Sequence, residues 1–302
     1  MRVTNAWGTM GRMTPNEPKS TEPTDRPSNA ELRDLCVRLA EGAAELVASR
    51  RAALTEGGRA IASQSKSSEV DPVTEVDKAA ERHIVERLAA LRPGDGVLGE
   101  EGANRASATG VEWIVDPIDG TVNFLYGLPS YAVSVAAAVD GRLVAGAVHN
   151  AATGESYSAA AGLGATVRRG GTTSAIGASR AAEVSRALVA TGFSYDAGWR
   201  RRQADMLSAV LPEVRDIRRM GSAALDLCAV AESRVDAYYE HGTHPWDWAA
   251  GVVIASEAGA VVHHPGLRDE EASGAVVTAA APGIAADFTG LLDAAGALNP
   301  LG

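Results

Sequence analysis

An apolar run that ends in two aspartates constrains the fold of this chain more than any other stretch. Residues 111–115 have the character of a buried strand, and Asp116 and Asp119 follow it three residues apart. Pro117 separates them and blocks a regular helix, because proline lacks a backbone N–H. A Gly-Thr step at 120–121 comes next. Mg²⁺ binds carboxylate oxygens and amides at the start of a helix can receive an anion, so the segment can hold both a metal and a phosphate.

Three further acidic motifs favour this interpretation over a solvated turn, which is the more frequent meaning of such a pattern in isolation. They are Asp71-Pro72-Val73-Thr74-Glu75-Val76-Asp77, Gly99-Glu100-Glu101-Gly102 and His244-Pro245-Trp246-Asp247-Trp248. With the two aspartates above, Glu100 and Asp247 give four carboxylates from separate parts of the chain. Gathering them without cations would be strongly repulsive, and metal binding would relieve this repulsion.

Together and in this order, the motifs resemble those of the inositol monophosphatase family of Mg²⁺-dependent phosphatases. The resemblance continues through 221–228 and 237–240 and covers roughly residues 31–297. Within the family, the sequence looks most like the actinobacterial inositol-1-monophosphatases. The resemblance implies an α+β or α/β fold, a five-layered αβαβα sandwich of the sugar-phosphatase type with the active site between its halves. It also implies a homodimer and inhibition by Li⁺.

The resemblance implies roles for individual residues around two or three Mg²⁺ ions. The expected metal ligands are Glu100, Asp116, the backbone carbonyl of Ile118, Asp119 and Asp247. Asp116 would bridge two ions, and a third, looser ion would share Glu100. Thr121 and Glu100 would orient and activate the attacking water, with Thr74 and Asp77 supporting Thr121. Thr74 and Asp77 are also compatible with N-cap roles at a following helix, which is the alternative for these two residues.

Substrate contacts are implied at Asp119, Gly120, Thr121, Ser222, Ala223, Glu240 and His244. The amides at 120–121 would hold the phosphate, and Glu240 would accept hydrogen bonds from ring hydroxyls. A carboxylate suits a polyol because it can accept from two adjacent hydroxyls, but it would also suit the ammonium group of histidinol phosphate. For His244, a structural role is an equal alternative.

The function implied is Mg²⁺-dependent hydrolysis of a small-molecule phosphate monoester, with release of myo-inositol and phosphate from inositol 1-phosphate. The alternative is a histidinol-phosphatase or another sugar or nucleotide phosphatase of the same superfamily. A different class is a regulatory binding protein without a main catalytic role. The complete set of metal ligands argues against that class.

Composition bounds these expectations. A net charge of −10 argues against a general nucleic-acid binder, and the lack of an 18-residue apolar run predicts no membrane span. Residues 1–28 are proline-rich and lack the apolar core of a signal peptide, which predicts a disordered tail and a cytoplasmic protein. Cys36 and Cys228 lie in apolar patterns that indicate packing rather than a disulfide.

Two domains are expected after the tail. Residues 29–180 would form an α+β domain with an antiparallel sheet and most metal ligands. Its predicted elements are a helix capped by Ser28, a helix opened by Asp77, and strands at 111–115, 131–139, 142–149, 155–160 and 165–168. Residues 181–302 alternate between the two periodicities, which is typical of an α/β layer that would complete the active site. The strands are expected at 187–191, 235–239, 260–263 and 275–279, and the helices at 199–211, 221–232, 245–257 and 284–294.

Overall fold

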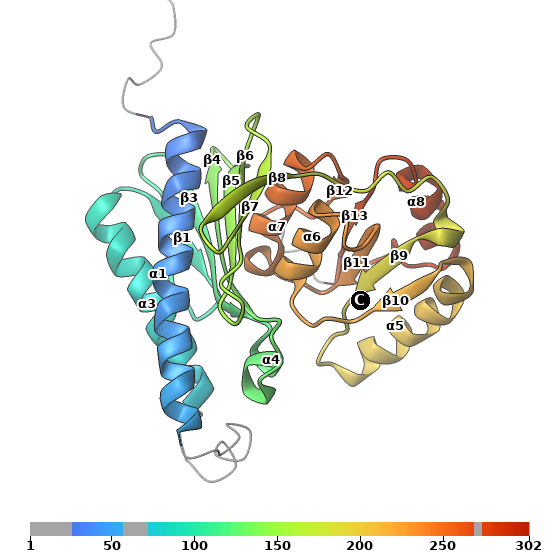
Figure 1. Cartoon of the computed structure of the whole chain (residues 1–302), viewed down its shortest axis with the longest axis horizontal. Coiled ribbons are helices and arrows are strands. Elements are labelled where there is room, and N and C mark those ends of the chain that lie inside the picture. Colours follow the sequence, from blue (N-terminus) through green and yellow to red (C-terminus); the bar gives the residue numbers. More distant parts are fainter. Residues whose placement is uncertain (1–25, 57–71, 269–273, 302) are drawn as a thin grey trace, which may run out of the picture.

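The computed structural model describes residues 26–56, 72–268 and 274–301 (Figure 1). The expected tail over 1–25 and the Asp71 end of the first acidic motif lie outside these residues. Arg26 and Ser28, which the tail prediction included, are described: Arg26 pairs with Asp140, and Ser28 caps the first helix.

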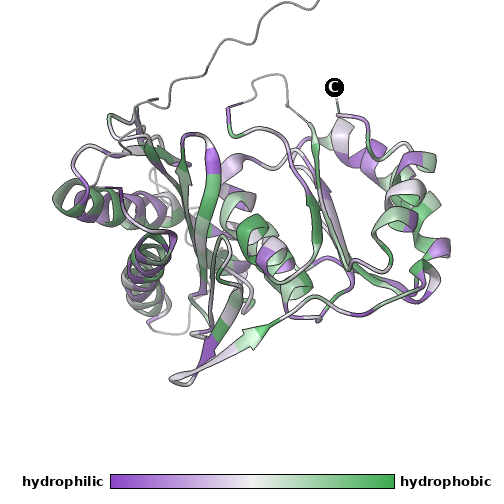
Figure 2. Cartoon of the chain, turned by 90° about the horizontal axis from the view of Figure 1, so that it is seen from above, coloured by the Kyte–Doolittle hydropathy of each residue, from purple (hydrophilic) through white to green (hydrophobic). Residues whose placement is uncertain are grey.

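The chain forms five layers, helices–sheet–helices–sheet–helices, which confirms the expected αβαβα sandwich (Figure 1). The outer helices on one side are α1 (Asn29–Thr55) and α3 (Pro72–Leu91). The central layer holds α6 (Ala223–Ala231) and α7 (Pro245–Glu257), and the far side holds α5 (Ala197–Val210) and α8 (Ala285–Ala294). Figure 2 shows the central helices from above, between the two sheets.

The first sheet has eight strands in the order β2-β1-β3-β4-β5-β6-β7-β8. Its neighbours are antiparallel except for β1 and β3, which are parallel. The strands are β1 (Gly96–Gly99), β2 (Asn104–Arg105), β3 (Val111–Asp119), β4 (Ala132–Val139), β5 (Arg142–Asn150), β6 (Ser156–Ala160), β7 (Ala165–Arg169) and β8 (Thr172–Ile176). The hairpin predicted at Asp140-Gly141 joins β4 to β5, with Val139 opposite Arg142.

The second sheet has five strands in the order β10-β9-β11-β13-β12. They are β9 (Leu188–Thr191), β10 (Asp216–Arg218), β11 (Ala237–His241), β12 (Val261–His263) and β13 (Val276–Ala280). β9 runs parallel to β10 and β11, whereas β13 is antiparallel to β11 and β12. The chain passes from the first sheet to the second once, through residues 177–187, which include a 3₁₀ turn at Val184–Arg186.

Successive side chains of a strand point to opposite sides, and helices cover both faces of the central strands of each sheet. Trp113 packs into the core beneath α1 and α3, and its neighbour Ile114 packs into the central core against α7. Small residues let α7 come close: a Cβ on Gly146 of β5 would lie 2.8 Å from the Cα of Ala250. The two cysteines are buried and free, as expected.

The sequence predicted the start of α1 correctly but not the start of α3. α1 begins after Ser28 with the predicted capping box, in which Glu31 accepts from the Ser28 backbone amide at 2.8 Å. α3 begins at Pro72 rather than at Asp77. Proline favours the first position of a helix because its φ is already helical and its missing N–H has no partner there. Thr74 and Asp77 therefore lie inside the helix, and the N-cap alternative for them is wrong.

A further short helix, α4 (Thr121–Tyr126), follows β3 directly. Among the described residues, no helix is both long and apolar enough to cross a membrane.

Candidate active site

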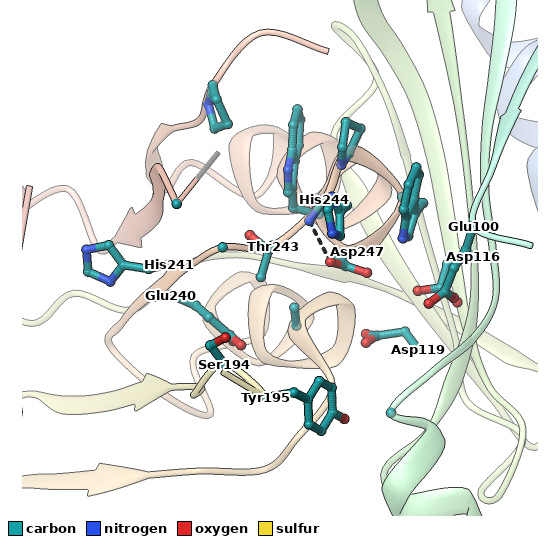
Figure 3. A pocket seen from close by; sticks show the side chains of 18 of the residues that line it. Glu100, Asp116, Asp119, Ser194, Tyr195, Glu240, His241, Thr243, His244 and Asp247 are labelled. Atoms are coloured by element: carbon teal, nitrogen blue, oxygen red, sulfur yellow. Dashed lines mark hydrogen bonds between the residues drawn. The ribbon is translucent and has the colours of Figure 1, made fainter. Parts of the chain in front are cut away.

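Three carboxylates from two distant parts of the chain meet at the centre of the molecule. Asp116 and Asp119 come from the end of β3, and Asp247 comes from the first turn of α7. Each offers an oxygen, and these oxygens lie within 4.8 Å of one another (Figure 3). The β3–β4 register shifts between Asp116 and Asp119. Pro117 lies in this interval and cannot donate to the ladder, so the strand is irregular where its two carboxylates enter the pocket.

Glu100 joins this cluster from the end of β1. The parallel register places Gly99 beside Val115, and the Glu100 amide donates to the Val115 carbonyl at 3.3 Å. Glu100 therefore lies next to Asp116, as Figure 3 shows. Glu81 of α3 fixes the loop that follows, because its carboxylate accepts from the amides of Glu101 (2.9 Å) and Ala103 (3.0 Å).

The turn after β3 carries three of the predicted residues. The Thr121 hydroxyl donates to the Ile118 carbonyl at 3.0 Å, and the Ile118 amide donates to Asp116 at 2.9 Å. Gly120 has φ +90°, and a Cβ there would lie 2.8 Å from the Ser130 carbonyl oxygen. Both constraints favour glycine, so the turn that presents Thr121 to the pocket depends on it.

Asp119 is oriented by the start of α6. The Ser222 hydroxyl and the Ala224 amide both donate to the same Asp119 oxygen, at 2.6 and 2.7 Å. Ser222 is buried behind Asp119, whereas Ala223 lies on the pocket wall. The structure thus places Ala223 on the cavity wall and gives the Ser222 hydroxyl to a carboxylate of the cluster.

Asp247 is held at the start of α7, where its carboxylate accepts from the His244 amide at 2.6 Å. The His244 ring is exposed on the pocket wall and stacks on Trp246, with ring centroids 4.8 Å apart. The neighbouring Trp248 is fully buried in the central core.

Crowding makes these carboxylates hard to ionise without a cation. Loss of surrounding water raises the pKa of Glu100 to about 7 and that of Asp119 to about 6. Burial, followed by the charges of its neighbours, raises the pKa of Asp116 and of Asp247 well above the usual range. A divalent cation among them would favour their charged forms. The all-oxygen donor set fits a hard ion such as Mg²⁺.

A cavity of about 780 Å³ extends from the carboxylates to β11 and the loop after β9. Figure 3 shows Glu240 and Ser194 on the side opposite Glu100 and Asp116. Glu240 lies inside β11 rather than after it, and its carboxylate accepts from the Tyr238 hydroxyl at 3.1 Å. Burial and the charge of Asp119 raise the pKa of Glu240 to about 7.

The sequence interpretation missed several residues of this pocket. It also gave catalytic roles to two residues that the structure places away from the cavity wall. Arg219, Tyr195 and Trp199 line the cavity and carried no motif, although Arg219 stands just before the 221–228 motif. Thr74 is half-buried and Asp77 is buried on α3, and neither is among the described residues that line the cavity.

Comparison with known proteins gives a consistent picture. A model of the inositol monophosphatase family matches residues 28–293. The inositol-1-monophosphatase of Mycobacterium bovis is 49% identical over 292 residues, which cover 93% of this chain and 99% of the relative. The Nus factor SuhB of Vibrio cholerae is 38% identical over 234 residues, 76% of this chain and 86% of the relative.

Solved structures are similar over nearly the whole chain. Mycobacterium tuberculosis SuhB superimposes with a TM-score of 0.79 at 46% identity, covering 91% of this chain and 100% of that structure. The inositol monophosphatase from Anabaena gives a TM-score of 0.71 at 29% identity, with coverage of 89% and 96%.

Proposed function

The chain belongs to the inositol monophosphatase family of phosphoric monoester hydrolases, and we propose that it releases myo-inositol and phosphate from inositol 1-phosphate. One observation carries this proposal: the carboxylate cluster of Asp116, Asp119 and Asp247 shares a single cavity with the carboxylate of Glu240. The cluster suits a metal and a phosphate, and Glu240 suits the hydroxyls of a polyol.

The metal site would use five positions to hold two or three Mg²⁺ ions: Glu100, Asp116, the Ile118 carbonyl, Asp119 and Asp247. Mg²⁺ supplies charge neutralisation at the phosphoryl oxygens and makes water a better nucleophile. The backbone amides at 120–121 would hold the phosphate beside the cluster.

Thr121 and Glu100 would orient the attacking water. The Thr121 hydroxyl hydrogen is used by the Ile118 carbonyl, so its oxygen remains able to accept a hydrogen bond from water. Thr74 and Asp77 would act from α3, without reaching the cavity wall, by supporting the segment around Thr121.

Glu240, Ala223 and His244 would contact the alcohol part of the substrate, with Ser222 acting through Asp119. Glu240 is the main candidate for specificity because its carboxylate faces the cavity across from the metal ligands. The same carboxylate could bind the ammonium group of histidinol phosphate, which is the alternative substrate.

Assembly and inhibition are further parts of the proposal. We expect a cytoplasmic homodimer that is inhibited by Li⁺ and that has no nucleic-acid or membrane partner. A regulatory binding role is the second candidate function, and the Vibrio cholerae relative named as a Nus factor favours it. The intact carboxylate cluster and the net charge of −10 count against it.

Phosphate release from four esters tests the proposal: inositol 1-phosphate, histidinol phosphate, fructose 1,6-bisphosphate and adenosine 3′,5′-bisphosphate. We expect Mg²⁺-dependent turnover with the highest kcat/KM on inositol 1-phosphate, and its loss on chelation or in Asp119→Asn. If kcat/KM is higher for another of these esters, that ester replaces inositol 1-phosphate as the proposed substrate. No turnover of any ester with Mg²⁺ would support the regulatory role instead.

A further inference from the structure

We propose that Tyr238 is a positioning residue that fixes the carboxylate of Glu240 for substrate recognition. The inference rests on the proposed function, because it assigns how the same site distinguishes a polyol ester from a featureless one. Tyr238 itself does not line the cavity in the described part of the chain.

The geometry of β11 places the two side chains together. Residues two apart in a strand share a face, so Tyr238 and Glu240 both point to the α6 side of the second sheet. Tyr238 is fully buried in the central core, and its hydroxyl donates to Oε2 of Glu240 at 3.1 Å. Glu240 is half-buried at the cavity edge.

A second contact holds Glu240 from the neighbouring strand. Gly192 directly follows β9, which pairs with β11 through Thr191 and Tyr239. A Cβ on Gly192 would lie 2.0 Å from Oε1 of Glu240, so the carboxylate occupies the space that a side chain would fill. The absent side chain at 192 and the Tyr238 hydroxyl therefore select one placement of Glu240.

This placement leaves acceptor capacity for a substrate. A carboxylate has about four lone-pair sites, and the Tyr238 hydroxyl uses one of them on Oε2. A side chain that is already held in its binding conformation loses less freedom when the ligand binds. Loss of the anchor should therefore weaken recognition and leave phosphoryl chemistry unchanged.

Tyr238→Phe removes the hydroxyl and keeps the ring. We expect its KM for inositol 1-phosphate to rise about tenfold, the size of one hydrogen bond to a charged group. We expect its kcat for inositol 1-phosphate to stay within about twofold of wild type, because the lost hydrogen bond acts in binding. Its kcat and KM for p-nitrophenyl phosphate should also stay within about twofold, because this ester has no ring hydroxyls for Glu240 to bind. The effect should vanish in a Glu240→Gln background, because a coupled pair shows no second loss.

Tyr239→Phe is the matched control. Tyr239 lies next to Tyr238 on the opposite face of β11, where its ring contacts Phe288 at a centroid distance of 6.3 Å. The Tyr239→Phe variant should leave the KM for inositol 1-phosphate unchanged.

Gly192→Ala provides an independent variant, because its new methyl group would displace Glu240 while leaving Tyr238 intact. We expect the same selective rise in the KM for inositol 1-phosphate.

The outcomes distinguish a failure of the positioning role of Tyr238 from a failure of the proposed substrate. Suppose that wild type hydrolyses inositol 1-phosphate, and that Tyr238→Phe and Gly192→Ala leave the KM for this ester unchanged or raise the KM for both esters equally. The positioning role is then overturned, and the proposed substrate stands. If wild type hydrolyses p-nitrophenyl phosphate but not inositol 1-phosphate, the proposed substrate is wrong and the positioning role falls with it.

Discussion

At the scale of single residues, Asp226 is an unusual carboxyl group near the site. It is fully buried on α6, and neither of its oxygens has a hydrogen-bond partner among the described residues. Burial, followed by the charges of Glu240 and Asp119, raises its pKa well above the usual range. The folded protein therefore favours the neutral acid.

The sign of this shift gives a pH-dependent prediction. A carboxyl whose pKa is higher in the folded state favours folding below its unfolded pKa of about 4 and loses that contribution as pH rises. Asp226→Asn should raise the free energy of unfolding by about 1–3 kcal/mol at pH 8. The gain should shrink toward pH 4, as followed by urea denaturation. The exposed Asp205→Asn is the control, and an equal gain at both pH values would contradict the neutral state.

Sequence motifs predicted the carboxylates of the site but not the residues that hold them. Asp116, Asp119 and Asp247 stand in patterns that few structural roles explain. Glu81 and Tyr238 are different, because their partners depend on how α3 and β11 pack and no local pattern specifies that. A carboxylate on the buried face of a helix, as at Glu81, is the one signal that could have been used.

At the scale of elements, a charged network joins the first sheet to the end of α6. Arg169 of β7 pairs with Glu155 and Glu232, and Arg234 pairs with the same two carboxylates at 3.1 and 3.0 Å. The Tyr157 hydroxyl donates to Glu232 at 3.0 Å. Partial burial acts to raise the pKa of Glu232, but the bonds from Arg169 and Tyr157 outweigh it and lower that pKa.

Removing the Arg169 guanidinium, which pairs with both Glu155 and Glu232, should weaken the contact between the first sheet and the end of α6. Arg169→Met keeps an apolar stem and should lower the free energy of unfolding by about 1 kcal/mol, since Arg169 is partly exposed and water screens its charge. The loss should diminish in high salt and as pH falls through the lowered pKa values of Glu155 and Glu232, where both carboxylates become protonated. Denaturant unfolding measures it, with Arg201→Met on the exposed side of α5 as control. A loss independent of salt would point to packing instead.

Elements with strong local signals were predicted well, and elements defined by their neighbours were not. The helix at Pro245–Glu257 and the hairpin at Asp140-Gly141 agree with the sequence prediction. β1 was missed because it has four residues, two of them glycine, and is defined by its pairing with β2 and β3. β8 was missed because it is a largely exposed edge strand without an apolar pattern.

At the scale of the whole molecule, the site is assembled from both sheets and the helices between them. Glu100, Asp116 and Asp119 come from the first sheet, Asp247 from the central layer and Glu240 from the second sheet. Periodicity indicated an α/β layer in the second half, but only the family resemblance implied how the halves stack. Stacking depends on side-chain volumes at contacts such as Gly146 with Ala250, which periodicity does not encode.

Mg²⁺ should therefore stabilise the whole fold. An ion that binds only the folded state adds about 2.7 kcal/mol at a concentration 100 times its Kd. We expect Tm to rise with Mg²⁺ in wild type and to change little in Asp119→Asn. With chelator present, Asp119→Asn should be at least as stable as wild type, because one repelling charge is gone. A full Mg²⁺-dependent rise in Asp119→Asn would remove Asp119 from the metal site.

The chain crosses between the two sheets once, at residues 177–187, so the protein could be split there into two fragments that each carry one sheet. A break there would leave Glu100, Asp116 and Asp119 in one fragment and Glu240 and Asp247 in the other. The fragments would still share the large apolar surface between α7 and the first sheet. Fused to two interacting proteins, they would form a complementation reporter, in which phosphate release signals that the partners have met.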